Sequence, residues 1–179
     1  IITPRRIGDP PRTHFGENFQ FGPVYTSPTY KKFGTTSSQY ENAIVVHARN
    51  RSLREQDNWS ETKWNILVDK LSKEGYNVIS IGLKKESLHI SGTVDKRQCD
   101  PQELVDILAS SKCILGPSSG AMHLATLCGC PQVVWTTDYN RDRYTKNWNP
   151  FSTDVVFLSE HGWHPTPEYI FDKVLNKEK

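Results

Sequence analysis

The sequence predicts an α/β fold with a doubly wound, mainly parallel sheet. Short apolar runs rich in Val and Ile recur along the 179 residues. In these runs apolar and polar residues do not alternate, as they do in a strand with one solvent-exposed face, so the runs are typical of strands buried on both faces. Amphipathic segments with helix-start signals separate these runs, and a repeated strand–helix alternation predicts parallel pairing.

Composition limits the class of protein. A chain of 179 residues is one ordinary domain, and a net charge of +2 does not argue for nucleic acid or a membrane surface. No stretch approaches the roughly 20 apolar residues of a membrane span, and the first residues lack a signal-peptide core. The four cysteines lack zinc-ligand spacing, so no metal site is expected. Cys113 and Cys128 lie in apolar runs and are expected to be buried thiols, and the cysteine usage suggests a reducing, cytoplasmic location.

Residues 1–42 differ from the rest. They hold many of the prolines and glycines and show little periodicity, which predicts an irregular arm or interdomain linker. The domain proper is expected over residues 43–179. The aromatic residues of the arm are expected to pack on this domain or on a missing partner: Phe15, Phe19, Phe21, Tyr25, Tyr30 and Phe33.

The first half of the domain reads as strand, helix, strand. Residues 43–48 form a continuous apolar run and predict a buried strand, which a polar loop over 49–58 follows. Ser60 is expected to cap a helix that ends near Glu74, with Gly75 as its stop. The apolar face of that helix has helical spacing: Trp64, Leu67, Val68 and Leu71. Residues 78–82 predict the second strand, and residues 88–90 a further short one.

The second half repeats the pattern. Asp100, Pro101 and Glu103 have the residue types of a helix start, and the buried face of that helix would carry Leu104, Ile107 and Leu108. Strands are expected at 113–115, 131–135 and 154–158. Helices are expected over 119–128 and 166–175, and a long polar and aromatic loop over 136–153.

Ligands of such sheets bind where the strands end at their carboxyl termini. This rule brings the loops 49–58, 82–97 and 116–120 into one crevice. The helix that starts at Ser118, Ser119 and Gly120 has small residues and no carboxylate in its first turn. Its N–H groups and dipole would attract phosphate. The alternative is an ordinary capped helix, since Ser is a favoured N-cap.

Basic side chains flank the same crevice. Arg49, Arg51 and Arg54 follow the first strand, and guanidinium forks suit phosphate oxygens. Alternatively they form a solvated loop that pairs with nearby acids. His123 lies one turn after Ser119, where it would donate to a phosphate or a sugar, or would pack between helix and sheet. A basic loop over 138–146 is expected either to contact the ligand or to be an exposed loop without a role in binding.

A rival interpretation is a serine hydrolase. Gly116, Ser118 and Gly120 match the Gly-x-Ser-x-Gly elbow between a strand and a helix. Triad partners follow in the required order, with Asp138 or Asp154 before His161 or His164. Against this, too few strands precede the elbow, and the usual glycine-rich oxyanion loop is missing upstream.

Several motifs together resemble a known family. They are Arg49, Asn58-Trp59-Ser60, Trp64, Gly75, Ile81-Gly82, the segment Ile114-Leu115-Gly116-Pro117-Ser118-Ser119-Gly120-Ala121-Met122-His123-Leu124-Ala125, and Gly129-Cys130-Pro131. Over residues 43–160 the chain resembles the C-terminal half of the heptosyltransferases. These are GT-B glycosyltransferases that use ADP-heptose or a similar nucleotide sugar.

The resemblance implies a Rossmann-like donor-binding domain. Ser118, Ser119 and Gly120 would hold the diphosphate beside His123, and Arg49 and Arg51 would compensate its charge. The base and ribose would lie against Gly82, Lys84 and residues 93–97. The nucleotide sugar is a substrate, and no cofactor or metal is expected, because protein dipoles and cations would stabilise the departing diphosphate.

The sequence also departs from that family. Many members carry Asp where this chain has Ser118, so the donor sugar is not defined. A GT-B enzyme has an N-terminal acceptor-binding domain, whereas 42 irregular residues precede the first strand here. We expect a domain excised from a larger enzyme, or a chain that needs a partner. The sequence defines no catalytic base, although Asp138 is a candidate. A non-catalytic nucleotide-binding module is the alternative function.

Overall fold

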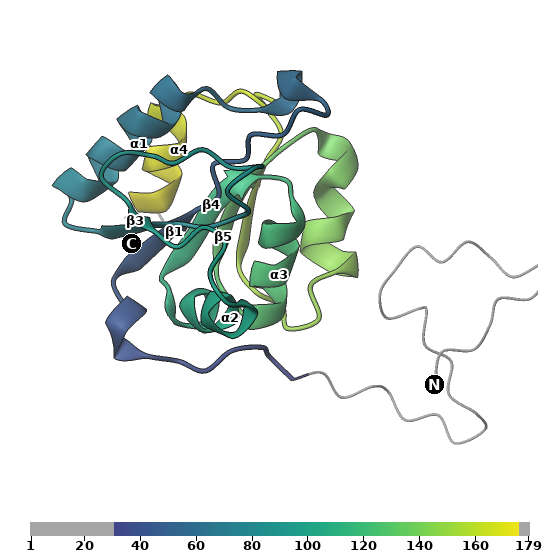
Figure 1. Ribbon diagram of the computed structural model, residues 1–179. Helices are drawn as coiled ribbons and strands as arrows, with labels where there is room; N and C mark the ends of the chain where they lie inside the picture. Colours follow the sequence, from purple (N-terminus) through teal and green to yellow (C-terminus); the bar gives the residue numbers. More distant parts are fainter. Residues whose placement is uncertain (1–30, 176–179) are drawn as a thin grey trace, which may run out of the picture.

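The computed structural model describes residues 31–175 and contains one six-stranded sheet (Figure 1). All neighbouring strands pair in parallel, in the order β3-β2-β1-β4-β5-β6. The strands are β1 (Ala43–Val46), β2 (Asn77–Ser80), β3 (Val94–Asp95), β4 (Cys113–Pro117), β5 (Gln132–Trp135) and β6 (Val155–Leu158). This is the Rossmann strand order, so the predicted doubly wound α/β fold is confirmed.

Four α-helices cover the two faces of the sheet. They are α1 (Glu61–Lys73), α2 (Pro101–Ser110), α3 (Gly120–Cys128) and α4 (Pro167–Leu175). Figure 1 shows α1 and α4 on one side of the sheet and α2 and α3 on the other, and the helices of each pair contact one another. None of these helices is long and apolar enough to cross a lipid bilayer.

The two-sided burial of the sheet explains its uninterrupted apolar runs. Ile44 and Val46 of β1 face the core under α1 and α4, whereas Ala43 and Val45 face the core under α2 and α3. Because successive side chains of a strand point to opposite faces, a strand covered on both faces needs apolar residues at every position. All four residues of β1 are buried.

The predicted helix starts are confirmed for two helices. The Ser60 side chain accepts from the N–H of Lys63 at the start of α1, and the Asp100 carboxylate accepts from the N–H of Gln102 at the start of α2. Gly75 follows α1 with a φ of 85°, a left-handed conformation that glycine adopts without strain. Trp64 and its apolar neighbours on α1 are buried, as predicted.

Two local predictions differ from the structure. Residues 88–90 form no strand: the chain pairs with the loop after β1 only in a single antiparallel bridge between Arg49 and Ser87, and no ladder continues from it. The edge strand lies later, at β3. The loop over 136–153 contains a 3-10 turn (Asp138–Asn140) and a π-helical turn (Arg143–Asn147), neither of which has an apolar periodicity in the sequence.

The described end of the arm is irregular apart from a 3-10 turn at Ser38–Tyr40. Phe33 is half exposed, and Tyr40 packs against the core under α2 and α3. The other predicted packing residues lie outside the described residues: Phe15, Phe19, Phe21, Tyr25 and Tyr30. The four cysteines are free thiols, and Cys113 and Cys128 are buried, as predicted.

Candidate functional site

A cleft lies at the carboxyl ends of β1, β2 and β4. The chain leaves β1 toward α1 and leaves β4 toward α3, which covers the opposite face, so a crevice opens between these neighbouring strands. The cleft has a volume of about 470 Å³. The loop after each of the three strands contributes to its lining, as the sequence predicted.

The start of α3 forms one wall of the cleft. Ser119, Gly120 and Ala121 line it, and Ser119 is the N-cap residue, although its side chain makes no capping hydrogen bond. No described acceptor pairs with the N–H groups of Gly120, Ala121 or Met122. A Cβ at Gly120 would meet no atom within 4 Å. Free N–H groups at a helix start, facing open space, are a site for an anion.

Arg49 is a buried cation in the floor of the cleft. Only 4% of its surface is exposed, and its guanidinium donates to the carbonyls of Ser118 (2.6 Å) and Asp57 (2.7 Å). It lies 4.8 Å from the centre of the Trp163 ring, and its Nε is buried without a partner among the described residues. Burial and the nearby Arg51 lower the pKa of Arg49 to about 10, so it remains charged at neutral pH.

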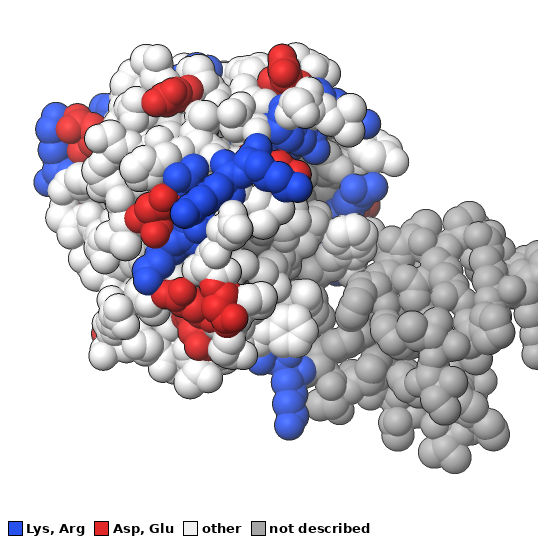
Figure 2. Space-filling model, in the orientation of Figure 1, with Lys and Arg blue, Asp and Glu red and all other residues white. Residues whose placement is uncertain are grey.

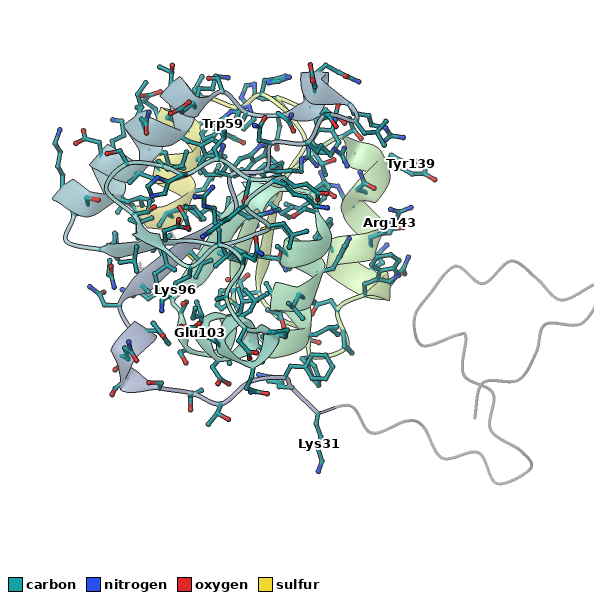
Figure 3. All side chains as sticks on the ribbon, in the orientation of Figure 1. Lys31, Trp59, Lys96, Glu103, Tyr139 and Arg143 are labelled. Atoms are coloured by element: carbon teal, nitrogen blue, oxygen red, sulfur yellow. The ribbon has the colours of Figure 1, made fainter. Side chains whose placement is uncertain are left out.

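Two further cations, each in an ion pair, line the cleft. Arg51 pairs with Asp57 at 3.2 Å, and Lys96 pairs with Glu103 at 2.6 Å. Arg51 and Lys96 both line the cleft. Figure 2 shows a blue band of Lys and Arg across this face, beside a red patch, and Figure 3 labels Lys96 and Glu103 in the same area. Because Arg51 and Lys96 are each paired with a carboxylate, they add less net positive charge to the cleft than Arg49 does.

His47 orients Ser119 at the corner of the cleft. Its Nδ1 lies 2.9 Å from Ser119 Oγ, which explains why the Ser119 side chain does not cap α3. Burial, with a smaller contribution from Arg49, lowers the pKa of His47 to about 4. The imidazole is therefore neutral at pH 7, and it adds a hydrogen bond to the corner rather than a charge.

Tyr144 covers the other side of the same corner. Its hydroxyl donates to Ser118 Oγ (2.9 Å) and accepts from the N–H of Ser119 (3.2 Å). Burial raises the pKa of Tyr144 to about 12, so the phenol is neutral. Tyr144 comes from the π-helical turn, a type of element that is frequent at functional sites.

The cleft also has apolar lining. Leu83, Pro101, Leu104 and Leu124 contribute to it beside the polar residues. Gly82 has a φ of 121°, and a Cβ there would lie 2.9 Å from both His47 and Ser87. The glycine is thus required by its backbone and by the close approach of the His47 ring.

The structure brings together five of the eight predicted site residues around one cleft: Arg49, Arg51, Gly82, Ser119 and Gly120. Ser118 contributes its carbonyl to Arg49 but turns its side chain to Tyr144. Lys84 is exposed and does not line the cleft. His123 lines a separate pocket, where its ring stacks on Tyr144 at 4.3 Å.

Sequence reasoning missed several residues of the site. Tyr144 and Trp163 lie in segments without periodicity, and no sequence signal points from either to Ser118 or Arg49. His47 has a usable signal, since it ends the apolar run of β1 and therefore falls at the edge of the sheet where ligands bind.

The geometry does not assemble a serine-hydrolase triad. Ser118 Oγ meets the Tyr144 hydroxyl, whereas His164 Nε2 lies 2.7 Å from the carbonyl of Gln56 and His161 stands edge-on to Tyr169 at 4.9 Å. A triad needs the serine beside an imidazole that a carboxylate orients. Within residues 31–175, no three His, Cys, Asp or Glu side chains are grouped to hold a metal ion.

Solved glycosyltransferases share this fold. A family 9 glycosyl transferase from Veillonella parvula matches with a TM-score of 0.51 and 14% identity, over 79% of this chain and 40% of its own. The E. coli heptosyltransferase WaaC with ADP matches with a TM-score of 0.58 and 13% identity, over 87% and 52%. The iron-containing E. coli glycosyltransferase TibC gives 0.53 and 20%, over 74% and 36%.

The chain therefore spans about half the length of these glycosyltransferases, or less. No protein-family model matches the sequence, and no curated protein sequence matches it. At identities of 20% or below, the likeness is one of fold. The described residues have a Rossmann-like α/β fold that is similar to part of these heptosyltransferase and family 9 glycosyltransferase structures.

Proposed function

We propose that this domain binds the nucleoside-diphosphate sugar donor of a GT-B glycosyltransferase. The observation that carries the proposal is the combination of free N–H groups at the start of α3 with the buried cation Arg49, in one cleft of about 470 Å³. A helix start and a guanidinium both favour diphosphate oxygens. In this pose the nucleoside lies against the apolar lining residues Leu83, Leu104 and Leu124.

The proposed chemistry is transfer of the sugar to a glycan or another acceptor. The bond from the anomeric carbon to the β-phosphate oxygen breaks, and an acceptor oxygen forms the new bond. Negative charge then grows on the departing diphosphate, where the N–H groups of α3 and Arg49 stabilise it more than in the ground state. The general base and the acceptor site belong to a second domain in this proposal.

Calorimetry with ADP, UDP, GDP and their sugar conjugates tests the donor site. We expect heat with at least one of these ligands and competition between the diphosphate and its sugar conjugate. The Gly120→Asp variant places a carboxylate at the anion site. Like charges repel there, and we expect affinity to fall by about tenfold or more, which corresponds to about 1.4 kcal/mol.

Gly120→Asp is a sharp test because the fold should accept it. The new side chain enters open space, and a carboxylate in the first turn of a helix is favourable. Thr62→Asp is the matched control, since it adds the same charge to the first turn of α1, where Thr62 is exposed and does not line the cleft. Absence of heat with every nucleotide would refute the proposal.

The contact between Ser118 and Tyr144 favours a second candidate, a nucleotide-binding module without transfer activity. The resemblance to heptosyltransferases implies that the Asp of many members at this position approaches the donor sugar, whereas here the hydroxyls of Ser118 and Tyr144 form a neutral pair. A protein with both halves that binds the nucleotide sugar and transfers no sugar to any acceptor would support this candidate over the enzyme.

A further inference from the structure

The loop after β1 turns back on itself between residues 51 and 58. A 3-10 turn (Glu55–Asp57) reverses the chain, and Arg54 before it has a φ of 62°, a left-handed conformation that is strained for a residue other than glycine. On the outside of the turn, His164 Nε2 lies 2.7 Å from the carbonyl of Gln56. A strained turn of this kind depends on contacts that hold its two ends together.

The Asn58 side chain joins the two ends of this loop. Its amide nitrogen donates to the carbonyl of Arg51 (2.8 Å), and its amide oxygen accepts from the N–H of Arg51 (3.3 Å). We call these two hydrogen bonds the Asn58 clip. Asn58 is half-buried and is not among the described residues that line the cleft, so the clip acts on the loop and not directly on a ligand.

The clip fixes the residue that holds Arg49. The carbonyl of Asp57, which precedes Asn58, accepts from Arg49 Nη2 at 2.7 Å. The other carbonyl that holds Arg49 is that of Ser118, which follows β4 and does not depend on the loop. The Asp57 carboxylate also pairs with Arg51, but this ion pair is partly exposed and therefore gives weaker support. Opening of the loop at Asn58 would thus leave Arg49 held at one end only.

We propose that Asn58 is a positioning residue for Arg49, and through it for the diphosphate of the donor. The inference rests on the proposed donor site and adds to it a residue outside the cleft. Arg49 Nε is buried without a partner among the described residues, so the guanidinium keeps a free donor while its other nitrogens are held. A cation that is already ordered loses less side-chain entropy when the ligand binds.

A second clip of the same kind provides a matched control. Asn149 donates to the carbonyl of Thr153 (2.8 Å) and accepts from its N–H (2.7 Å). Thr153 precedes β6, so this loop lies at the amino ends of the parallel strands, at the edge of the sheet away from the cleft. Asn149 is also half-buried. Replacement of either asparagine by alanine removes the same two hydrogen bonds.

Calorimetry with the nucleoside diphosphate that binds compares Asn58→Ala with Asn149→Ala. We expect Asn58→Ala to weaken affinity by about threefold to tenfold, and Asn149→Ala to leave it within about twofold. The midpoints of thermal unfolding should fall by similar amounts, since each variant loses equivalent bonds. Equal losses of affinity in the two variants would overturn the proposal.

A double-mutant cycle with Arg49→Lys asks whether Asn58 acts through Arg49. Lysine lacks the planar fork that Asp57 and Ser118 hold, so Asn58→Ala should weaken affinity by a clearly smaller factor in the Arg49→Lys background. A purely structural role of Asn58 gives the same factor in both backgrounds, and that result would also overturn the proposal.

The Nε–H resonance of Arg49 in the free protein tests the positioning without any nucleotide. Arg49→Lys assigns it by its loss. We expect it to shift or broaden in Asn58→Ala and to stay in place in Asn149→Ala, and an unchanged resonance in Asn58→Ala would contradict the proposal. If Asn58→Ala does not fold, Asn58→Asp and Asn149→Asp give the same comparison, because aspartate keeps the acceptor and loses the donor of each clip. Absence of nucleotide binding to the wild-type protein would refute the donor site, whereas a shifted Arg49 resonance would still support the role of Asn58 in holding Arg49.

Discussion

At the scale of single residues, Arg49 performs two tasks. It ties the loop after β1 to the end of β4 through the carbonyls of Asp57 and Ser118, and it supplies buried positive charge to the cleft. Its position follows from the sequence, because a residue three places after a buried strand falls at the carboxyl edge of the sheet. Its burial does not, since a loop with three arginines and two acids resembles a solvated surface.

We predict that Arg49→Lys lowers both stability and affinity. Lysine keeps the charge but not the planar fork, so one of the two buried carbonyls loses its donor. The expected loss is about 2 kcal/mol in the free energy of unfolding, measured in urea, with weaker nucleotide binding in calorimetry. Arg54→Lys, on the exposed loop, is the control. Full stability in Arg49→Lys would contradict the assigned structural role.

His47 predicts a pH dependence of stability. Its pKa is lowered to about 4 by burial and by Arg49, compared with 6.5 in the unfolded chain. Between pH 4 and 6.5 the unfolded state binds more protons than the folded state. The stabilisation that comes from keeping His47 neutral is therefore complete above pH 6.5 and is lost as the pH falls toward 4. The loss is roughly 3 kcal/mol at most. His123 adds a contribution of the same sign, since its pKa is also lowered to about 4, by burial and Arg143.

Urea unfolding between pH 4 and 7 measures this effect. The His47→Asn variant should show a smaller decrease in stability over that range than the wild-type protein. His89→Asn serves as the comparison, because His89 is exposed. Parallel pH curves for the wild-type and His47→Asn proteins would rule out the buried imidazole as the source.

At the scale of elements, the periodic segments were predictable and the irregular ones were not. The two-sided apolar run of β1 and the helical stripe of α1 determine their structures locally. The edge strand β3 has two exposed residues, Val94 and Asp95, and depends on pairing with β2 rather than on its own pattern. The Tyr144 turn likewise depends on tertiary contacts with Ser118 and His123.

Asp100 and Ser119 both precede a helix, but only Asp100 caps its helix through the side chain, and mutation should separate the two. Asp100 caps α2 through its side chain, so Asp100→Ala should cost about 1 kcal/mol of unfolding free energy, and Asp100→Ser should recover most of it. Ser119→Ala removes no cap, because Ser119 bonds to His47 instead. Denaturant unfolding of all three variants tests this difference.

Ser119→Ala should change nucleotide affinity, measured by calorimetry, more than it changes the free energy of unfolding. Loss of the hydroxyl frees His47 and removes a polar group from the cleft wall. We expect weaker nucleotide binding with a small change in stability. A stability loss equal to that of Asp100→Ala would show that Ser119 acts mainly as a cap.

At the scale of the whole molecule, the site is a property of strand order. The reversal between β1 and β4 brings together Arg49 and Ser119, which are 70 residues apart in sequence. The alternation of strands and helices predicted this crevice, and the resemblance to heptosyltransferases suggested the proposed ligand class. The sequence did not predict the depth of the crevice. Nor did it predict that the side chains of Ser118 and His123 turn away from it, because both depend on tertiary packing around Tyr144.

The last prediction concerns metal removal. In the proposed complex, Arg49 and the free N–H groups of α3 neutralise the diphosphate, so nucleotide binding should not need a divalent cation. The comparison matters because TibC, which shares the fold, is iron-containing. We expect the dissociation constant of the bound nucleotide to be the same, within about twofold, in EDTA and in Mg²⁺ or Fe²⁺. A tenfold loss in EDTA that Mg²⁺ or Fe²⁺ restores would mean that the protein cations and dipoles are insufficient, and that a metal completes the anion site.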